Sequence, residues 1–189
     1  MASKSTLSLV KRAREGDGEA RSALIGRFYQ DWIDKFHGDL GTSIRKMYDT
    51  GDLVQSAVAD ALRDLPKLKN EGLFFAWVTS IIRHKIALHH RRLRKEVALK
   101  ESTNVAFQEP VTCQDHAQDS LERDEIYLQT LDDILALFPE HPEEMAAMVL
   151  SVIDERSIGF IMEFLDLSER TVFRRIRDGV GLLKRRIGP

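Results

Sequence analysis

The sequence predicts an all-α protein made of two small helical domains joined by a flexible linker. Nearly every periodic segment spaces its apolar residues three or four positions apart, and no alternating β-branched run predicts a strand. Periodicity fails at residues 99–120, where Ser, Thr, Asn, Gln and Glu gather around Pro110. A connection of this length is uncommon inside one compact domain. We therefore expect domains at residues 1–98 and 121–189, with the linker between them.

The helices of the first domain follow from apolar spacing and from residues that stop or start a helix. Gly16 is expected to end the first helix. Pro66 is expected to end the helix before it, because proline has no amide hydrogen to donate. Asn70 suits a cap position at the start of the longest helix. In chain order, the expected helices lie at residues 6–15, 24–38, 44–48, 53–65 and from Asn70 to Lys95.

The second domain is predicted to contain four helices. Pro142 suits a first helical turn, and the acids Glu143 and Glu144 after it favour the positive end of the helix dipole. Ser168 is predicted to cap the last helix by accepting hydrogen bonds from backbone amides. The four helices are expected at residues 121–138, 142–153, 157–165 and 168–187.

The last two helices form the most informative segment of the chain. One face of the final helix is an apolar stripe, and its other faces carry arginines: Arg170, Arg174, Arg175 and Arg177. A short helix, a tight turn and a second helix rich in arginine are the parts with which a helix-turn-helix enters a DNA major groove. This segment therefore predicts DNA binding.

Charge is unevenly distributed along the chain. The formal net charge is only -2, yet residues 83–95 carry six Lys or Arg, three His and no acid. Such a tract attracts phosphate and predicts a second nucleic-acid contact. Residues 101–144 carry twelve acids against Arg123 alone. Two interpretations of this acidic segment stay open: it solubilises the linker and the second domain, or it folds back on the basic helices and masks DNA binding.

The cellular setting is predicted from what the sequence lacks. Cys113 is the single cysteine, so it has no partner for an internal disulfide or a CxxC metal site. No apolar run reaches the length that spans a membrane, and no apolar segment of a signal peptide follows the first basic residues. These observations predict a cytoplasmic protein without membrane insertion.

Several motifs resemble those of a known family. Asp52-Leu53-Val54-Gln55, together with residues 74–78, 81–86 and 91–92, resembles conserved region two of sigma-70-family factors, most closely the small two-domain extracytoplasmic-function type. Residues 168–172 and the basic residues after them resemble region four. The resemblance covers roughly residues 20–95 and 121–187. It implies a bacterial sigma factor that binds core RNA polymerase, recognises -10 and -35 promoter elements and promotes transcription initiation.

The resemblance also implies a role for each matched residue. The polymerase would be contacted by Asp52, Leu53, Val54 and Gln55. A flipped base of the -10 element would enter the loop that carries Lys67, Lys69 and Asn70, and the upstream part of that element would meet Arg83, His84, Lys85, Arg91 and Arg92. The -35 element would be contacted by Ser168, Glu169, Arg170, Thr171, Arg174, Arg175 and Arg177. Such a protein is not an enzyme, and the resemblance implies no catalytic residue, cofactor or metal. An anti-sigma factor is a possible partner.

The helix-turn-helix departs from the family pattern at three positions. Gly159 replaces a glutamate, Ile161 replaces a small alanine, and Asp166 replaces the glycine of the turn. Aspartate tolerates a left-handed backbone better than most residues, so the turn is predicted to persist. The larger Ile161 is predicted to change how the two helices pack.

Three other functions are compatible with parts of the sequence. A helix-turn-helix regulator, or a sigma-like decoy that does not engage polymerase, explains the basic helices and leaves the match at residues 52–55 to chance. A metalloenzyme would use His84, His89 and His90, but His84 and His89 are five residues apart, whereas the histidines of an HExxH motif are four apart. An interaction protein would depend on the acidic segment.

Overall fold

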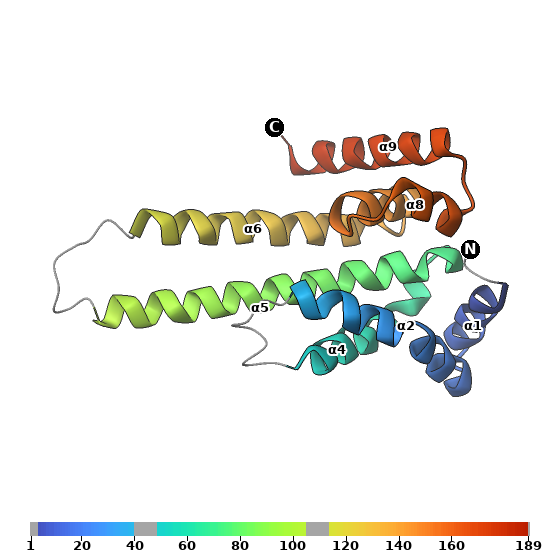
Figure 1. The fold of residues 1–189 in the computed structure, drawn as a ribbon, viewed down its shortest axis with the longest axis horizontal. Helices are drawn as coiled ribbons and strands as arrows, with labels where there is room; N and C mark the ends of the chain where they lie inside the picture. The colour runs from blue at the N-terminus through green and yellow to red at the C-terminus, as the bar shows by residue number, and fades with distance from the viewer. Residues whose placement is uncertain (1–3, 40–48, 105–113, 189) are drawn as a thin grey trace.

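The computed structural model describes residues 4–39, 49–104 and 114–188, and every regular element within these ranges is helical, as predicted (Figure 1). The helix expected at residues 44–48 lies outside the described residues. None of the described helices is both long enough and apolar enough to cross a membrane. The α-helices are α1 (Lys4–Arg14), α2 (Gly18–Asp39), α4 (Thr50–Asp64), α5 (Phe74–Asn104), α6 (Gln114–Leu137), α7 (Pro142–Met148), α8 (Ile158–Leu165) and α9 (Glu169–Ile187).

Local signals set the boundaries of the first helices as expected. Gly16 has a φ of 97°, a left-handed conformation that glycine adopts without strain, and it follows the end of α1. Two short 3₁₀ helices, Leu65–Lys67 and Glu71–Leu73, connect α4 to α5. The Asn70 side chain accepts a hydrogen bond from the Gly72 amide (3.0 Å) at the start of the second one. The capping residue therefore fixes the entry to α5.

Helices α5 and α6 run antiparallel and side by side (Figure 1). Both extend into the segment predicted as the linker, because α5 continues to Asn104 and α6 begins at Gln114. The residues just after Lys95 include Glu, Ala, Leu and Lys, which are strong helix formers, so α5 propagates beyond its last apolar periodic position. The division of the chain into domains at residues 98 and 121 stays a prediction.

The helix expected at residues 142–153 is divided in the structure. Pro142 occupies its first turn as predicted, but α7 ends at Met148 and a π-helical turn, Val149–Ile153, follows. The turn ends at Asp154, whose side chain is fully buried. π-Helical turns are rare and often lie at functional positions. Here the turn brings a carboxylate from the second half of the chain to the helices of the first.

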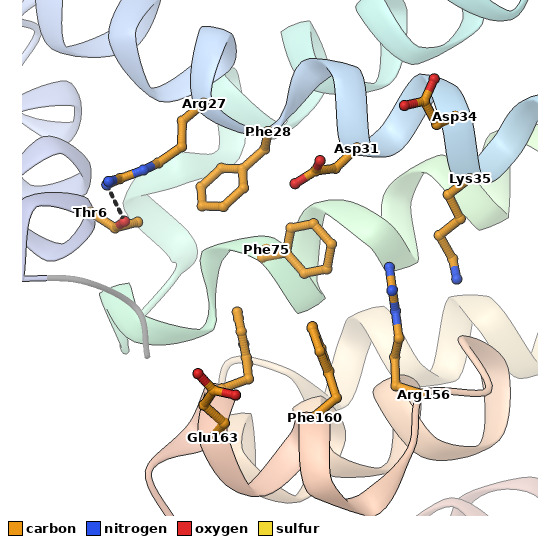
Figure 2. A pocket seen from close by; sticks show the side chains of 11 residues that line it. Thr6, Arg27, Phe28, Asp31, Asp34, Lys35, Phe75, Arg156, Phe160 and Glu163 are labelled. Atoms are coloured by element: carbon orange, nitrogen blue, oxygen red, sulfur yellow. Dashed lines mark hydrogen bonds between the residues drawn. The ribbon is translucent and has the colours of Figure 1, made fainter.

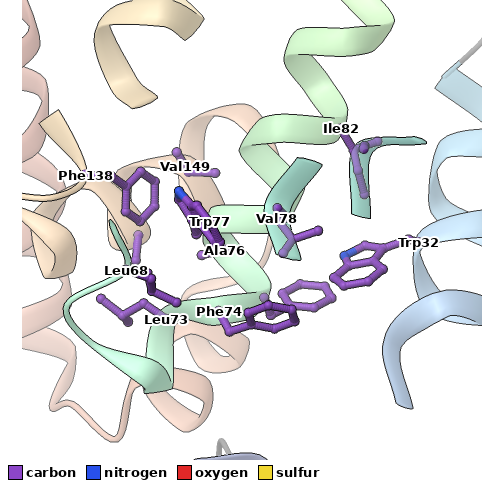
Figure 3. Close-up of a cluster of buried hydrophobic side chains, with 14 of the residues drawn as sticks. Trp32, Leu68, Leu73, Phe74, Ala76, Trp77, Val78, Ile82, Phe138 and Val149 are labelled. Carbon is purple, nitrogen blue, oxygen red and sulfur yellow. The ribbon is translucent and has the colours of Figure 1, made fainter. Parts of the chain in front are cut away.

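The buried hydrophobic side chains form a cluster that includes residues from both halves of the chain. Trp77 of α5 lies near Leu68, Phe138 and Val149, and Trp32 lies beside Phe74 on the other side of α5 (Figure 3). Burial of aromatic rings contributes more to stability per residue than burial of small aliphatic side chains. Helix α5 is therefore the central element on which both halves pack.

One close approach within the second half depends on a glycine. A Cβ atom added at Gly179 of α9 would lie 2.7 Å from the carbonyl oxygen of Glu144 and 3.1 Å from the Met148 Cβ. At Gly181, two positions later in the same helix, the nearest atom would be Nη1 of Arg185, at 3.6 Å. The absence of a side chain at Gly179 therefore lets α9 approach α7 closely.

We expect Gly179→Ala to lower the free energy of unfolding by about 1–3 kcal/mol, because α7 and α9 would have to separate. Gly181→Ala is the matched control, and it should leave stability unchanged or raise it by up to about 1 kcal/mol, because alanine favours a helix more than glycine does. Urea denaturation of both variants measures the difference. Equal stability of the two variants would show that α7 and α9 do not pack this closely.

Candidate nucleic-acid interface

The segment Asp52-Leu53-Val54-Gln55 is divided between the surface and the core. Asp49 precedes α4 and accepts a hydrogen bond from the Gly51 amide (2.6 Å), which fixes the start of the helix. Asp52 and Gln55 are exposed, three residues apart, and therefore share one face of α4. Leu53 and Val54 are buried in the core. The structure thus offers the acid and the amide to a partner, while the two apolar residues hold the helix in place.

The loop before α5 presents two lysines and an asparagine. Lys67 and Lys69 are exposed, and Lys67 pairs with Asp64 (2.7 Å). The half-buried Asn70 uses its side-chain oxygen to accept the amide hydrogen bond described above. A cavity of about 190 Å³ lies next to the loop, and its lining includes Trp77 of α5 and Phe138 after α6. The loop is therefore close to the second half of the chain.

The basic residues of α5 have different environments. Lys85 faces α4, where its ammonium group contacts Asp60 (2.7 Å) and Ser56 (2.8 Å). Its hydrogen bond to Asp60 is the main reason that the pKa of this carboxyl lies below its usual range. Arg92 is exposed. Burial, followed by the nearby charge of Arg92, lowers the pKa of His89, so this ring is neutral at neutral pH and adds no positive charge to the tract.

The other predicted contacts of α5 face the second half of the chain. His84 lies 2.9 Å from Asp132 of α6, and Arg91 lies 2.6 Å from Glu125 of the same helix. The hydrogen bond from Arg91 also lowers the pKa of Glu125. Arg83 is directed at Asp154 (3.9 Å) and lies over the ring of Phe36. The structure therefore gathers His84, Arg91 and Arg83 against acidic side chains of the chain itself.

Helices α8 and α9 have the arrangement of a helix-turn-helix. Ser157 caps α8 by accepting a hydrogen bond from the Phe160 amide (3.2 Å). Asp166 ends α8 in a left-handed conformation, with φ 55° and ψ 47°, as predicted for the turn. Ile161 is fully buried, so the bulky replacement lies within the packing of this segment. The unusual residues at these two positions are accommodated by the fold.

The predicted role of Ser168 as a cap is wrong. The residue does hold the extended cap position before α9, but its side chain makes no capping hydrogen bond. Its hydroxyl instead bonds to the hydroxyl of Thr171 (3.0 Å). Two neighbouring hydroxyl groups satisfy each other here, so the serine does not need a backbone amide as its partner.

The arginines of α9 divide into an outward set and an inward residue. Arg170, Arg174 and Arg177 are exposed, and they line a hollow of about 350 Å³ with Thr171 and Phe173. Glu169 is also exposed, at the first turn of α9. Arg175 instead turns toward α7, where it pairs with Glu143 and Glu144. The face that α9 offers to a partner therefore contains three of the four predicted arginines.

Phe173 is a member of this outward face that the sequence analysis missed. The residue is 52% exposed, which is unusual for a large aromatic residue. It precedes Arg174 directly and lies one helical turn from Arg170 and from Arg177. In the sequence, Phe173 lies beside the apolar stripe of the final helix and resembles a core residue. The arginines one helical turn away on either side are the signal that could have placed it on the outward face.

A larger cavity, of about 700 Å³, opens between α2 and α8 (Figure 2). Phe75 of α5 and Phe160 of α8 point into it from opposite sides, and Arg156 lies over the Phe160 ring (4.8 Å). Phe164 of α8 reaches Phe75, with ring centroids 5.7 Å apart. The two halves of the chain thus meet through an aromatic contact at this cavity. Within the described ranges, no three His, Cys, Asp or Glu side chains are grouped to hold a metal ion.

An all-helical fold with a helix-turn-helix and a second basic helix defines a DNA-binding protein. Comparison with known families narrows this class of DNA-binding proteins to one family. The family model for ECF sigma factors matches residues 3–178. The chain belongs to the ECF sigma factor family. No curated protein matches the chain. Membership identifies a sigma factor that acts with RNA polymerase on promoter DNA in transcription initiation, and such a protein is not an enzyme.

Proposed function

We propose that α4 docks the chain on core RNA polymerase, that the loop before α5 and α5 itself contact the -10 element, and that α9 enters the major groove at the -35 element. The exposed pair of Asp52 and Gln55 supports this proposal most directly, because it leaves a polar face of α4 open to a protein partner. Promoter-specific transcription by bacterial core polymerase mixed with the purified chain is the direct test. Transcription that starts equally well without the chain would contradict the proposal.

For the -10 element, we infer that Lys67, Lys69 and Asn70 form the edge of a pocket for a flipped base. Enzymes and binding proteins that read an unpaired base combine polar contacts to its edge with apolar or aromatic surfaces against its face. Trp77 and the cavity of about 190 Å³ lie next to this loop. The helix that follows carries five basic residues that would contact backbone phosphates: Arg83, His84, Lys85, Arg91 and Arg92.

For the -35 element, Arg170, Arg174 and Arg177 are the proposed readers, because α9 exposes them on one face. An arginine that donates two hydrogen bonds to guanine contributes about 1–3 kcal/mol of discrimination. Phe173 adds an apolar surface of the kind that contacts a thymine methyl group. Ser168, Glu169 and Thr171 lie at the start of α9, nearest the turn. Arg175 has a supporting role in this proposal, since its partners are on α7.

The place of action and a further partner follow from the same proposal. RNA polymerase works in the cytoplasm, so we infer that the chain does as well. An anti-sigma factor would inhibit the chain by covering the surfaces used on polymerase or DNA, and the exposed face with Asp52 and Gln55 is one such surface.

We expect Arg174→Ala to weaken binding to -35 duplex DNA by about 5- to 150-fold, which corresponds to the loss of one bidentate base contact. Arg185→Ala is the matched control, because it removes the same charge from the exposed end of α9. We expect this variant to lose less affinity for the duplex. Fluorescence anisotropy with duplexes enriched from a random pool by the full chain measures both. Replacing each thymine of the duplex with deoxyuridine tests Phe173, because it removes only the methyl group.

An equal loss in the two arginine variants would assign Arg174 to phosphate instead of to a base. The salt dependence of binding separates these roles further. Removing a phosphate contact lowers the slope of log K against log salt by about one, whereas removing a base contact leaves it nearly unchanged.

A further inference from the structure

We propose that Arg14 of α1 is a positioning residue for the base-reading loop, residues 67–70 between α4 and α5. The inference deepens the proposed -10 role of this loop and rests on it. The arginine holds the loop in the conformation that receives the flipped base and does not touch the base itself. Helix α1 thereby takes part in promoter recognition, although it carries none of the predicted DNA contacts.

The Arg14 guanidinium contacts the chain on both sides of Lys69 and Asn70. Its Nη2 atom donates a hydrogen bond to the backbone carbonyl oxygen of Leu68. Its Nη1 atom lies 3.0 Å from the carboxylate of Glu71. Because both contacts come from one rigid, planar group, they fix the two ends of the segment between them relative to each other.

The backbone of the base-reading loop is extended where Arg14 contacts it. Leu68 ends the first 3₁₀ helix with φ -75° and ψ 108°, and Asn70 precedes the second with φ -116° and ψ 108°. A backbone carbonyl in an extended segment needs a hydrogen-bond donor from outside that segment or from water. The guanidinium is this donor for Leu68, so the conformation of the loop depends on α1.

The first contact also affects the cavity proposed for the base. Leu68 is buried, and it lines the cavity of about 190 Å³ together with Lys67 and Trp77. The carbonyl that Arg14 binds belongs to the peptide group that joins Leu68 to Lys69. Movement of this peptide group would therefore displace a wall of the cavity and the neighbouring lysine together.

Helix α1 is attached to α2 near both of its ends, so Arg14 extends from a fixed support. Near the start of α1, the hydroxyl group of Thr6 accepts a hydrogen bond from Arg27 (2.6 Å). At the other end, the Ala13 carbonyl oxygen accepts one from Nε of Arg21 (3.1 Å). A group that is held on a packed helix positions its partners more precisely than one on a loop.

Helix α1 contacts the loop region through an apolar side chain as well as through the ion pair. A Cβ atom added at Gly72 would lie 3.6 Å from Cδ2 of Leu7. The side chains of Arg14 and Glu71 are 30% and 19% exposed. Partial burial reduces screening by salt, and a hydrogen bond between charged groups is roughly twice as strong as a neutral one. The ion pair is therefore suited to hold the loop in place.

Hydrogen exchange of the free chain measures whether Arg14 holds the loop. The amides of Leu68 and Leu73 donate hydrogen bonds within the two 3₁₀ turns (3.1 Å each). We expect Arg14→Ala to raise their exchange rates by about 5- to 30-fold, because the local opening of the loop becomes easier. Lys11→Ala is the matched control, since it removes an exposed positive charge from the same helix. Unchanged exchange in Arg14→Ala would overturn the proposal.

Binding of single-stranded DNA to the holoenzyme measures the consequence for base reading. The probes are oligonucleotides enriched from a random pool by the wild-type holoenzyme, with each nucleotide in turn made abasic. Loss of the flipped base should weaken wild-type binding by about 5- to 150-fold. With Arg14→Ala, we expect the loss at that position to be at least about fivefold smaller. Lys11→Ala should keep the wild-type profile, and the same profile with Arg14→Ala would overturn the proposal.

Two further variants separate positioning from an effect of charge alone. Arg14→Lys keeps the positive charge but lacks the planar group that reaches two partners, so its abasic profile should stay closer to that of Arg14→Ala than to wild type. The double variant Arg14→Ala with Glu71→Gln has no uncompensated carboxylate at the loop, and it should stay impaired as well. Full recovery of the wild-type profile by either variant would assign only a charge effect to Arg14 and overturn the proposal.

Failure of this inference and failure of the proposed base-reading role are distinguishable. Asn70→Ser keeps a capping oxygen and removes the amide NH₂ group that would read the base. If Asn70→Ser changes the abasic profile and Arg14→Ala does not, the loop reads a base without help from α1. If neither variant changes the profile, the loop reads no base, and the positioning role is wrong with it. Circular dichroism and urea denaturation establish that the variants are folded.

Discussion

Replacing Asp52 and Gln55 together with alanine is expected to weaken binding of the purified chain to bacterial core RNA polymerase by roughly a hundredfold. Both side chains are exposed on one face of α4, and a hundredfold loss corresponds to about 2.8 kcal/mol for the pair, which is in the range found when hot-spot residues of an interface are truncated. The fold should persist, because neither side chain is buried. Asp52 lies in the first turn of α4, so its loss lowers stability by at most about 1 kcal/mol.

The measurement is direct binding to core polymerase by surface plasmon resonance or by competition with a labelled chain. Gln30→Ala with Asp31→Ala is the matched control, since it removes another exposed amide and another exposed acid, from α2. We expect this control to bind as the wild type does. Undiminished polymerase binding by a folded Asp52/Gln55 double variant would remove the docking assignment and leave the partner of this face of α4 open.

Three of the helix boundaries were predictable because local residues determine them. Gly16 ends α1 with a left-handed backbone, Asn70 caps the entry to α5, and Asp166 turns the chain between α8 and α9. Each of these effects acts over two or three residues, so the sequence pattern contains all of the information. Ser168 shows the limit of this logic, because its hydroxyl had a choice of local partners and bonds to Thr171.

The environment of the predicted site residues was not predictable from spacing. Arg175 reaches acids 31 and 32 positions earlier in the chain, and Arg91 reaches an acid 34 positions later. Such pairs depend on how α6, α7 and α9 pack, which helical periodicity does not determine.

The interpretation that the acidic segment folds back on a basic helix was one of two left open by composition. The structure places Glu125 against α5, which favours that interpretation for α6.

The residues 52–55 show how a motif and a helical pattern complement each other. The apolar periodicity of α4 includes Leu53 and Val54, and both are buried as that pattern predicts. The family resemblance assigned all four positions to polymerase binding. The structure divides them, since only Asp52 and Gln55 are exposed. In the proposed docking on polymerase, the two apolar residues would therefore act only through the placement of α4.

Replacing Asp154 with asparagine is expected to lower the free energy of unfolding by about 3 kcal/mol. The carboxylate is fully buried, and it contacts the Lys35 ammonium group and the Arg156 guanidinium, each at 2.8 Å. The Lys35 ammonium group also donates to the Asp154 carbonyl oxygen (3.1 Å). Removing one partner of a buried ion pair typically costs about 3–5 kcal/mol, because it leaves the other charge uncompensated. Lys35 is partly exposed, so we expect a loss at the lower end of this range of unfolding free energies.

Urea denaturation measures this loss, and Asp64→Asn is the control for an exposed ion pair. The side chains of Lys67 and Asp64 are 67% and 44% exposed, so their separation should cost less than about 1 kcal/mol. Equal, small losses in the two variants would show that Asp154 is not held as a buried charge. A loss confined to Asp154→Asn would support the ion cluster that joins α2 to the turn before α8.

The same variant tests the proposed division into two domains. Lys35 lies in the first predicted domain and Asp154 in the second, and Trp77 packs near Phe138 across the same boundary. With both connections in place, the wild-type chain should unfold in one cooperative step. Asp154→Asn weakens the connection without changing either helical core directly. We expect its unfolding monitored by tryptophan fluorescence, which reports on Trp32 and Trp77, to separate from that monitored by circular dichroism. Coincident transitions in the variant would mean that the two halves fold as one unit even without the bridge.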